Sequence, residues 1–213
     1  MFTLLLLDSI KILANEFQKT LYQVLRYTYY HIPHFCYNKN LFISGNCRIC
    51  LVEIINIPKP VVSCSIPVTE NLTVFTRTPF AAKSRENVLE FLLLNHPLDC
   101  PVCDQGGECD LQEYSELFGQ YVSRLYMSRN AISSKLINGI ETNMNRCINC
   151  KKCVNLSHVL GLKPLSLFGR SLGSEIYNAF SIFVLKKILE LHELSGNIFD
   201  ICPVSKKNKR LNL

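Results

Sequence analysis

The sequence is organised around one short stretch, residues 96–109, which reads HPLDCPVCDQGGEC. This stretch brings one imidazole and three thiols together, with three, two and five residues between successive members. Four donors of this kind can close around one metal centre, because iron and zinc both accept sulfur and nitrogen ligands. His96, Cys100, Cys103 and Cys109 are therefore a candidate ligand set. A lone histidine before a proline is more often a surface or capping residue, but three cysteines follow this one closely.

The remaining cysteines divide into two further sets of four, one on each side of this stretch. The upstream set is Cys36, Cys47, Cys50 and Cys64, and the downstream set is Cys147, Cys150, Cys153 and Cys202. All 11 cysteines of the chain are used if His96 stands in place of a twelfth thiolate. We therefore predict three metal centres in sequence order, an arrangement typical of a protein that conducts electrons.

The spacing of the upstream set favours a [2Fe–2S] cluster. Ten, two and thirteen residues separate its members, so one close pair has two distant partners. In such a cluster each iron takes one pair of thiolates. The plant ferredoxin pattern has a shorter first gap and a longer last gap, so this set is a variant of it. A zinc ribbon is the alternative, but it normally uses two close pairs of cysteines.

The downstream set favours a [4Fe–4S] cluster. Cys147, Cys150 and Cys153 are separated by two residues each, and Cys202-Pro203 follows some fifty residues later. In bacterial ferredoxins the cysteine before proline serves a second cluster. Only one such triplet is present here, and the other Cys-Pro pair, Cys100-Pro101, lies in the central set, so we assign all four cysteines to one centre.

The hydrophobic pattern predicts an α+β fold that begins with a ferredoxin-like β-grasp. Alternating and apolar runs predict strands over 2–7, 10–13, 51–57, 61–66 and 72–76, with a helix from Glu16 to about Tyr29. Thr78 and Pro79 predict the start of a helix that runs to Asn95. The broad buried face expected for this helix comprises Ala81, Ala82, Val88, Leu89, Phe91, Leu92 and Leu93.

The second half of the chain is expected to be less regular. A short helix over 111–118 should end at Gly119, residues 160–174 resemble a loop, and residues 176–191 are mixed with a helical end. We predict a [2Fe–2S] domain over 1–80, a histidine-ligated [4Fe–4S] segment over 81–125, and a second [4Fe–4S] domain over 126–213.

Composition narrows the function classes. The net charge of +6 is scattered except in the C-terminal tail, so nucleic acid is not an expected partner. We find no signal or transit peptide and no run of about 18 apolar residues, so we expect reduced thiols and no membrane span. The chain lacks a Gly-x-Gly-x-x-Gly dinucleotide motif, and we assign no catalytic residue and no bound FMN or NAD.

Several stretches together resemble one family, the large iron–sulfur subunit of NADH:ubiquinone oxidoreductase, respiratory complex I. They are residues 36–37, 45–53 (GNCRICLVE), 95–112, 193–198 (ELSGNI) and 200–204 (DICPV). The resemblance covers essentially the whole chain, and its central block is highly specific. The chain departs from the family after the Cys-Pro-Val motif. There the family usually continues with Gly-Ala-Leu and a large C-terminal domain, whereas this chain has Ser205 and a basic tail.

The resemblance implies one [2Fe–2S] and two [4Fe–4S] clusters, with a histidine ligand at the position of His96. Electrons would arrive from the flavin subunit that oxidises NADH and leave through quinone-side iron–sulfur subunits toward ubiquinone. The expected location is the peripheral arm on the matrix side of the mitochondrial inner membrane, in an organelle-encoded subunit, or the cytoplasmic face of a bacterial membrane. We also expect a separate chain to supply the C-terminal domain. The alternatives are the iron–sulfur diaphorase subunit of a soluble NAD-linked hydrogenase or formate dehydrogenase, and a zinc-binding structural module.

Overall fold

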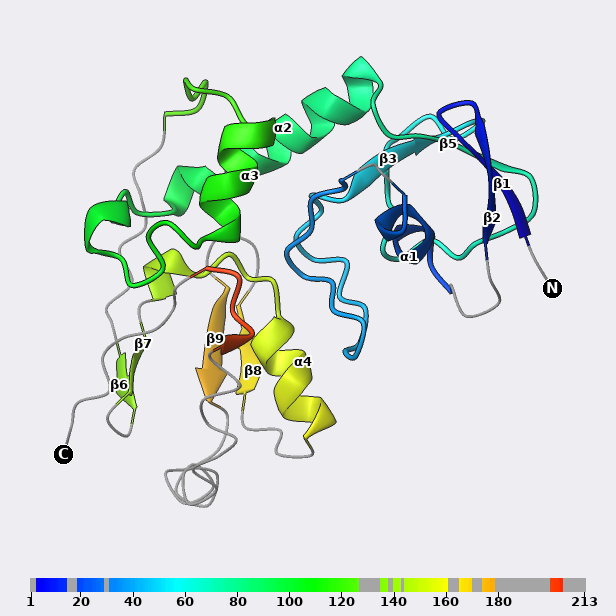
Figure 1. Ribbon diagram of the computed structural model, residues 1–213. Helices are drawn as coiled ribbons and strands as arrows, with labels where there is room; N and C mark the ends of the chain where they lie inside the picture. Colours follow the sequence, from blue (N-terminus) through cyan, green and yellow to red (C-terminus); the bar gives the residue numbers. More distant parts are fainter. Residues whose placement is uncertain are drawn as a thin grey trace. The chain divides into compact units, whose positions relative to one another are not determined.

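The computed structural model (Figure 1) describes residues 3–14, 19–28, 31–126, 135–137, 140–142, 144–160, 165–169, 174–178 and 200–204. The chain divides into two compact units. Unit 1 contains Met1–Tyr37, Ile43–Phe91 and Tyr114–Arg124, and unit 2 contains Asn38–Phe42, Leu92–Glu113 and Leu125–Leu213. Helices and sheets are mixed along the sequence, so the predicted α+β class is confirmed.

Unit 1 is built on a five-stranded sheet in the order β2-β1-β5-β3-β4. The strands are β1 (Thr3–Leu7), β2 (Ile10–Ala14), β3 (Leu51–Ile54), β4 (Val61–Val62) and β5 (Leu72–Phe75). β1 and β5 are parallel, whereas the other neighbouring pairs are antiparallel. Asp8 and Ser9 both have positive φ, which suits the tight two-residue turn between β1 and β2.

The helix α1 (Leu21–Arg26) is shorter than the helix predicted over 16–29. It begins after Thr20, whose backbone N–H donates to the Gln23 side chain. Two further N–H groups at the start of the helix, those of Leu21 and Tyr22, donate to the carbonyls of Ile66 and Ser63. These bonds satisfy groups that a helix start leaves without intrahelical partners. Residues 15–18, 29 and 30 lie outside the described part of the chain.

One apolar core joins α1 to the sheet. Its buried members are Leu7, Leu21, Tyr22, Leu25, Ile32, Tyr37, Cys50, Val52, Ile54, Val62, Cys64 and Val74. Two cysteines of the upstream set therefore belong to this core. Packing around them fixes the segments that carry them.

The third and fourth strands are shorter than predicted because turns interrupt them. After Ile54 the chain turns through Asn56, which has a φ of 67°, and Ile57 N–H donates to the Ile54 carbonyl at 3.1 Å. After Val62 the chain turns again, and Ser65 N–H donates to the Val62 carbonyl at 3.1 Å. Cys64 lies inside this second turn.

The long helix α2 (Pro79–Asn95) and the short helix α3 (Asp110–Phe118) confirm both predicted helices. Thr78 caps α2, since its hydroxyl accepts a hydrogen bond from Ala81 N–H at 3.2 Å. Gly119 ends α3. A Cβ at this position would lie only 2.4 Å from the Ser115 carbonyl oxygen, which explains the glycine.

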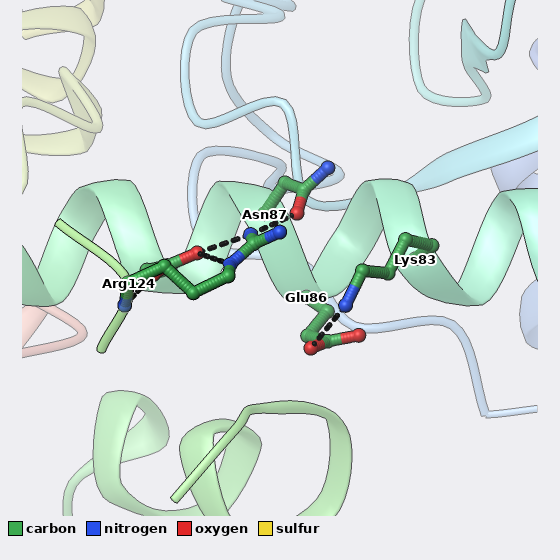
Figure 2. Close-up of polar contacts among 5 residues, drawn as sticks. Lys83, Glu86, Asn87 and Arg124 are labelled. Carbon is green, nitrogen blue, oxygen red and sulfur yellow. Dashed lines mark hydrogen bonds and ion pairs between the residues drawn. The ribbon is translucent and has the colours of Figure 1, made fainter. Parts of the chain in front are cut away.

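The buried face predicted for α2 is partly wrong. Ala81 and Leu89 are buried as expected, but Ala82 is exposed and the Phe91 side chain is 49% exposed. Val88, Leu92 and Leu93 are only half-buried. Two charged residues, Arg85 and Glu90, are buried in their place because both have strong hydrogen-bond partners. Figure 2 shows polar contacts along α2, including the hydrogen bond that the Arg124 guanidinium donates to the exposed Asn87.

Unit 2 contains short elements around the other two ligand sets. They are the 3-10 helices η1 (Cys100–Val102) and η2 (Met144–Arg146), the helix α4 (Lys152–Val159), and the strand pairs β6 (Lys135–Ile137) with β7 (Ile140–Thr142) and β8 (Leu165–Phe168) with β9 (Glu175–Asn178).

Strands β8 and β9 correct the predicted loop over 160–174 and the mixed segment that follows it. The register of β8 and β9 pairs Phe168 with Glu175, so backbone hydrogen bonds stabilise a segment without a clear hydrophobic pattern. Residues 179–199, which include the predicted helical end, lie outside the described residues. Among the helices that the structure describes, none is long and apolar enough to cross a membrane.

Candidate metal centres

The structure brings the four cysteines of the upstream set together in unit 1. All four are buried. The Cys47 thiol donates to the Cys36 sulfur at 3.3 Å, and the Cys64 thiol is hydrogen-bonded to both Cys36 and Cys50. The contacts thus include two pairs, Cys36 with Cys47 and Cys50 with Cys64, which suits two irons that each take two thiolates.

Backbone N–H groups point toward these sulfurs. Cys36 accepts backbone hydrogen bonds from Asn46 and Cys47, and Cys47 accepts one from Ile49. Gly45 and Arg48 have φ values of 58°, in the left-handed region, and these local reversals allow the loop to wrap inward. Inward N–H groups form a concavity that stabilises negative charge.

The Cys50 segment is fixed by hydrogen bonds to successive carbonyl groups. The buried Ser63 donates to the Cys50 carbonyl through its N–H at 3.1 Å and its hydroxyl at 2.8 Å. The neighbouring Leu51 carbonyl accepts two bonds from the Arg85 guanidinium, at 2.9 Å from Nε and 2.7 Å from Nη2. Sequence reasoning missed both residues. The only signal for Arg85 was a charge on the apolar side of a helix.

The four thiols of the upstream set are close enough to affect one another's pKa values. Hydrogen bonds from Cys47 and Cys64 lower the pKa of Cys36 to about 2. A hydrogen bond from Cys64 lowers the pKa of Cys50 to about 7, whereas the pKa of Cys64 itself is raised by its bonds to Cys36 and Cys50. Four buried thiolates this close together repel one another, so full deprotonation requires positive charge among them.

The central set is carried by the end of α2, by η1 and by the start of α3. His96 directly follows Asn95, the last residue of α2. Cys100 begins η1, and the Cys103 N–H donates to the Cys100 carbonyl at 3.3 Å. The Nδ1 atom of His96 is buried and makes no hydrogen bond within the described residues, although the residue has other interactions.

Gly106 and Gly107 allow the central loop to turn back tightly toward Cys109. A Cβ at Gly106 would lie 2.7 Å from the Cys100 carbonyl oxygen, so only glycine fits there. Gly107 has a φ of 87°, which glycine adopts readily. The loop leads to Cys109, whose sulfur accepts hydrogen bonds from Leu111 and Gln112 N–H in the first turn of α3. Burial raises the pKa of Cys109, and the nearby Cys103 acts in the same direction.

The downstream set is gathered in unit 2. Burial raises the pKa of Cys150, and Cys202, Cys153 and Cys147 add to this effect through their charge, so all four lie close enough to interact. The Asn149 N–H donates to the Cys147 sulfur at 3.4 Å. This geometry again favours anionic sulfur at the centre of the loop.

Backbone reversals shape the loop that carries the downstream triplet. Asn149 and Lys151 adopt positive φ values of 53° and 63°, and they alternate with the cysteines. The Lys152 N–H consequently donates to the Cys150 sulfur. Cys153 is the second residue of α4, and the Cys202 thiol donates to the Val204 carbonyl at 2.5 Å.

Within the described residues, no three His, Cys, Asp or Glu side chains are placed to hold one metal ion. An iron–sulfur cluster does not require such convergence. Its sulfides supply much of the iron coordination, so the protein gives each iron two ligands in a [2Fe–2S] cluster and one in a [4Fe–4S] cluster.

Three family models match consecutive parts of the chain. A 2Fe-2S iron-sulfur cluster binding domain matches residues 7–79. The NADH-ubiquinone oxidoreductase-G iron-sulfur binding region matches residues 85–124, and the ferredoxin-like domain of NADH-quinone oxidoreductase subunit 3 matches residues 138–206. Each range contains one of the three ligand sets.

Similar proteins include mitochondrial and bacterial oxidoreductase subunits. The chain is 48% identical to the NADH-ubiquinone oxidoreductase 75 kDa subunit of Reclinomonas americana, over 81% of this chain and 24% of that protein. It is 50% identical to the mitochondrial NADH dehydrogenase [ubiquinone] iron-sulfur protein 1 of Solanum tuberosum, over 81% and 23%. It is 42% identical to an NADH-quinone oxidoreductase subunit of Rickettsia prowazekii, over 97% and 30%. The chain thus spans less than a third of the length of these relatives.

Among solved structures, a chain of the NAD+-reducing [NiFe]-hydrogenase in the H2-reduced state has a similar fold. The TM-score is 0.82 at 23% identity, over 99% of this chain and 88% of that one. Fold and ligand sets together define an iron–sulfur protein with domains of the 2Fe–2S and 4Fe–4S types. The chain is homologous to part of the large iron–sulfur subunit of NADH:quinone oxidoreductase, which is named the 75 kDa subunit in Reclinomonas americana, and its residues 85–124 match the iron–sulfur binding region of that family.

Proposed function

We propose that this chain is an iron–sulfur electron-transfer subunit in the peripheral arm of respiratory complex I. It passes electrons from the flavin subunit that oxidises NADH toward ubiquinone. The observation that carries the proposal is the relationship to the Rickettsia prowazekii oxidoreductase subunit at 42% identity over 97% of the chain, which includes all three ligand sets. Other subunits of the complex are its partners. We place it on the matrix side of the mitochondrial inner membrane, a proposal that the mitochondrial relative from Solanum tuberosum supports.

We assign the ligands to one [2Fe–2S] and two [4Fe–4S] clusters. Cys36 with Cys47 and Cys50 with Cys64 hold the two irons of the first cluster, in keeping with their thiol contacts. His96, Cys100, Cys103 and Cys109 hold the second cluster. Cys147, Cys150, Cys153 and Cys202 hold the third cluster.

The clusters supply one-electron redox chemistry when bound, and the protein determines how favourable reduction is. Thiolates donate negative charge, which lowers the reduction potential, whereas backbone N–H groups that point at sulfur stabilise that charge and raise it. Burial of the upstream thiols excludes water from the first site. A neutral imidazole at the second site makes that cluster one charge less negative than a four-cysteine cluster. These residues bind and orient the clusters.

The ligand assignment is tested by metal analysis and spectroscopy of the anaerobically purified protein. We expect about ten irons and an equal amount of acid-labile sulfide per chain, from one binuclear and two cubane clusters. Reduction with dithionite should give separate electron paramagnetic resonance (EPR) signals for [2Fe–2S] and [4Fe–4S] centres. Stoichiometric zinc in a preparation that is active in its complex would exclude the assignment.

The fold of the hydrogenase chain supports a second candidate. That chain is matched over 88% of its length, so a compact module of this fold occurs in an NAD-linked hydrogenase. An iron–sulfur diaphorase subunit would use the same clusters. The identity of 23% is well below the 41–50% found with the complex I subunits, which favours the first proposal. Co-purification with hydrogenase subunits would instead establish the second.

A further inference from the structure

Arg85 is an unusual residue because it is a buried cation without a carboxylate in direct contact. It extends from α2, is 5% exposed, and directs both Nε and Nη2 to the carbonyl oxygen of Leu51. Within the described residues, these two bonds are its hydrogen bonds, and no carboxylate forms an ion pair with it. An arginine stays charged in proteins, and burial of an uncompensated charge is costly. A negative group nearby is therefore expected.

The groups that compensate Arg85 are identified by the structure. Leu51 directly follows Cys50, so the guanidinium lies one residue from an upstream ligand. Burial lowers the pKa of Arg85, while the negative charges of Cys50 and Asp8 act in the opposite direction. The Asp8 carboxylate is itself engaged by Thr76, at 2.8 Å from its N–H and 2.5 Å from its hydroxyl. Of these two charges, Cys50 has the larger effect on Arg85, so the thiolate set is its main negative neighbour.

We propose that Arg85 is the buried counter-charge of the first cluster and raises its reduction potential. This inference rests on the proposed [2Fe–2S] site. Two ferric ions, two sulfides and four thiolates sum to two negative charges, and gain of one electron without a proton makes three. A fixed cation stabilises the more negative state by more than the less negative state, because attraction grows with the charge. Arg85 acts through its charge and through Leu51, so it is a positioning residue.

The test is an EPR-monitored redox titration of the full 213-residue chain, reconstituted anaerobically with iron and sulfide and reduced with dithionite. Arg85→Gln removes the charge and keeps a donor that can reach the carbonyl. Arg85→Lys keeps the charge but loses the two-pronged contact. Lys83→Gln is the matched control, since it removes a cation from an exposed position of the same helix.

For R85Q, at a fixed solution potential, we expect the ratio of reduced to oxidised first cluster to fall about tenfold. This change corresponds to a reduction potential lower by about 59 mV for a one-electron couple. R85K should retain most of the wild-type potential although its thermal stability falls as in R85Q. K83Q and the signals of the other clusters should not change. Equal shifts in R85Q and R85K, or no shift in R85Q, would overturn the proposal, because a merely structural role moves both variants alike.

A second variant decides the matter if R85Q does not assemble its first cluster. Asp8→Asn removes the competing anion and keeps acceptor and donor atoms for Thr76. The charge of Arg85 is then less compensated, so the potential of the first cluster should rise. An unchanged or lower potential in D8N would reject the role of Arg85. Absence of any [2Fe–2S] signal from the wild-type chain would instead count against the proposed function.

Discussion

Arg146 and Asp99 form an ion pair that joins the second and third ligand sets within unit 2. Nη2 and Nε of Arg146 lie 3.3 and 3.4 Å from Oδ2 of Asp99. The next residues along the chain are Cys147 and Cys100, so the pair ties together the starts of two ligand loops. The Arg146 side chain is 10% exposed and that of Asp99 is 37% exposed. Removal of the carboxylate would therefore leave a largely buried cation without its counter-ion.

Asp99→Asn should destabilise unit 2 by about 1 kcal/mol, because this pair lies between the exposed and buried limits. It should also speed the loss of iron from both [4Fe–4S] sites to a chelator, while the [2Fe–2S] site is unaffected. Visible absorbance during chelation measures both rates. Glu116→Gln is the control, since it removes an exposed carboxylate from α3. Equal behaviour of the two variants would show that the ion pair does not hold the loops.

Ser63→Ala tests how the first site is fixed. The Ser63 hydroxyl is fully buried and donates to the Cys50 carbonyl at 2.8 Å, so its loss should cost about 1 kcal/mol. The [2Fe–2S] signal should then decay faster than in the wild type. Ser65→Ala removes a similar bond, from a hydroxyl to the Val62 carbonyl at 3.0 Å, at an exposed residue. If S65A destabilises the cluster as strongly as S63A, burial beside Cys50 is not the cause.

The sequence predicted the parts of this molecule that depend on local patterns. The cysteine spacing, the cap at Thr78 and the stop at Gly119 are local signals, and the helices α2 and α3 follow from them. The β-grasp sheet was predicted because its strands are apolar, although the turns at Asn56 and Cys64 shorten two of them.

What the sequence did not show depends on contacts between distant residues. Arg85 and Leu51 are 34 positions apart, as are Arg124 and Glu90, and Arg146 and Asp99 are 47 apart. A prediction from helical periodicity places charged residues on the solvent side. It therefore expected apolar residues of α2 to be buried where the structure buries Arg85 and Glu90. The strands β8 and β9 were missed because backbone pairing stabilises them without a clear alternating pattern.

His96→Ala should remove the signal of one [4Fe–4S] cluster and leave the other two clusters assembled, since the three ligand sets share no residue. His96→Cys should restore a cluster at this site with a lower reduction potential, because a thiolate adds one negative charge. EPR spectra of the reduced variants distinguish these results. Loss of all three signals in a folded H96A protein would show that the partition of ligands is wrong.

The contact between Glu90 and Arg124 should make the stability of unit 1 decrease at acid pH. Arg124 donates to the Glu90 carboxylate from its backbone N–H at 2.6 Å and from Nε at 3.0 Å, beside its bond to Asn87 (Figure 2). These bonds lower the pKa of Glu90 from its ordinary value of 4.5 in the folded protein. The unfolded chain therefore binds the proton first as the pH falls. The stabilisation is complete above about pH 4.5 and is lost as the pH falls through the lower folded-state pKa.

Glu90→Gln removes this titration. At pH 7 the variant should unfold at a lower temperature than the wild type, and the difference should shrink as the pH is lowered below about 4.5. Thermal unfolding followed by circular dichroism across this range measures the difference. Glu86→Gln is the control, because that carboxylate lies on the same helix and pairs with the exposed Lys83 at 2.9 Å. A constant gap between E90Q and the wild type from pH 7 to pH 3 would show that the charge of Glu90 does not hold Arg124, and that its shape or hydrogen bonds alone do so.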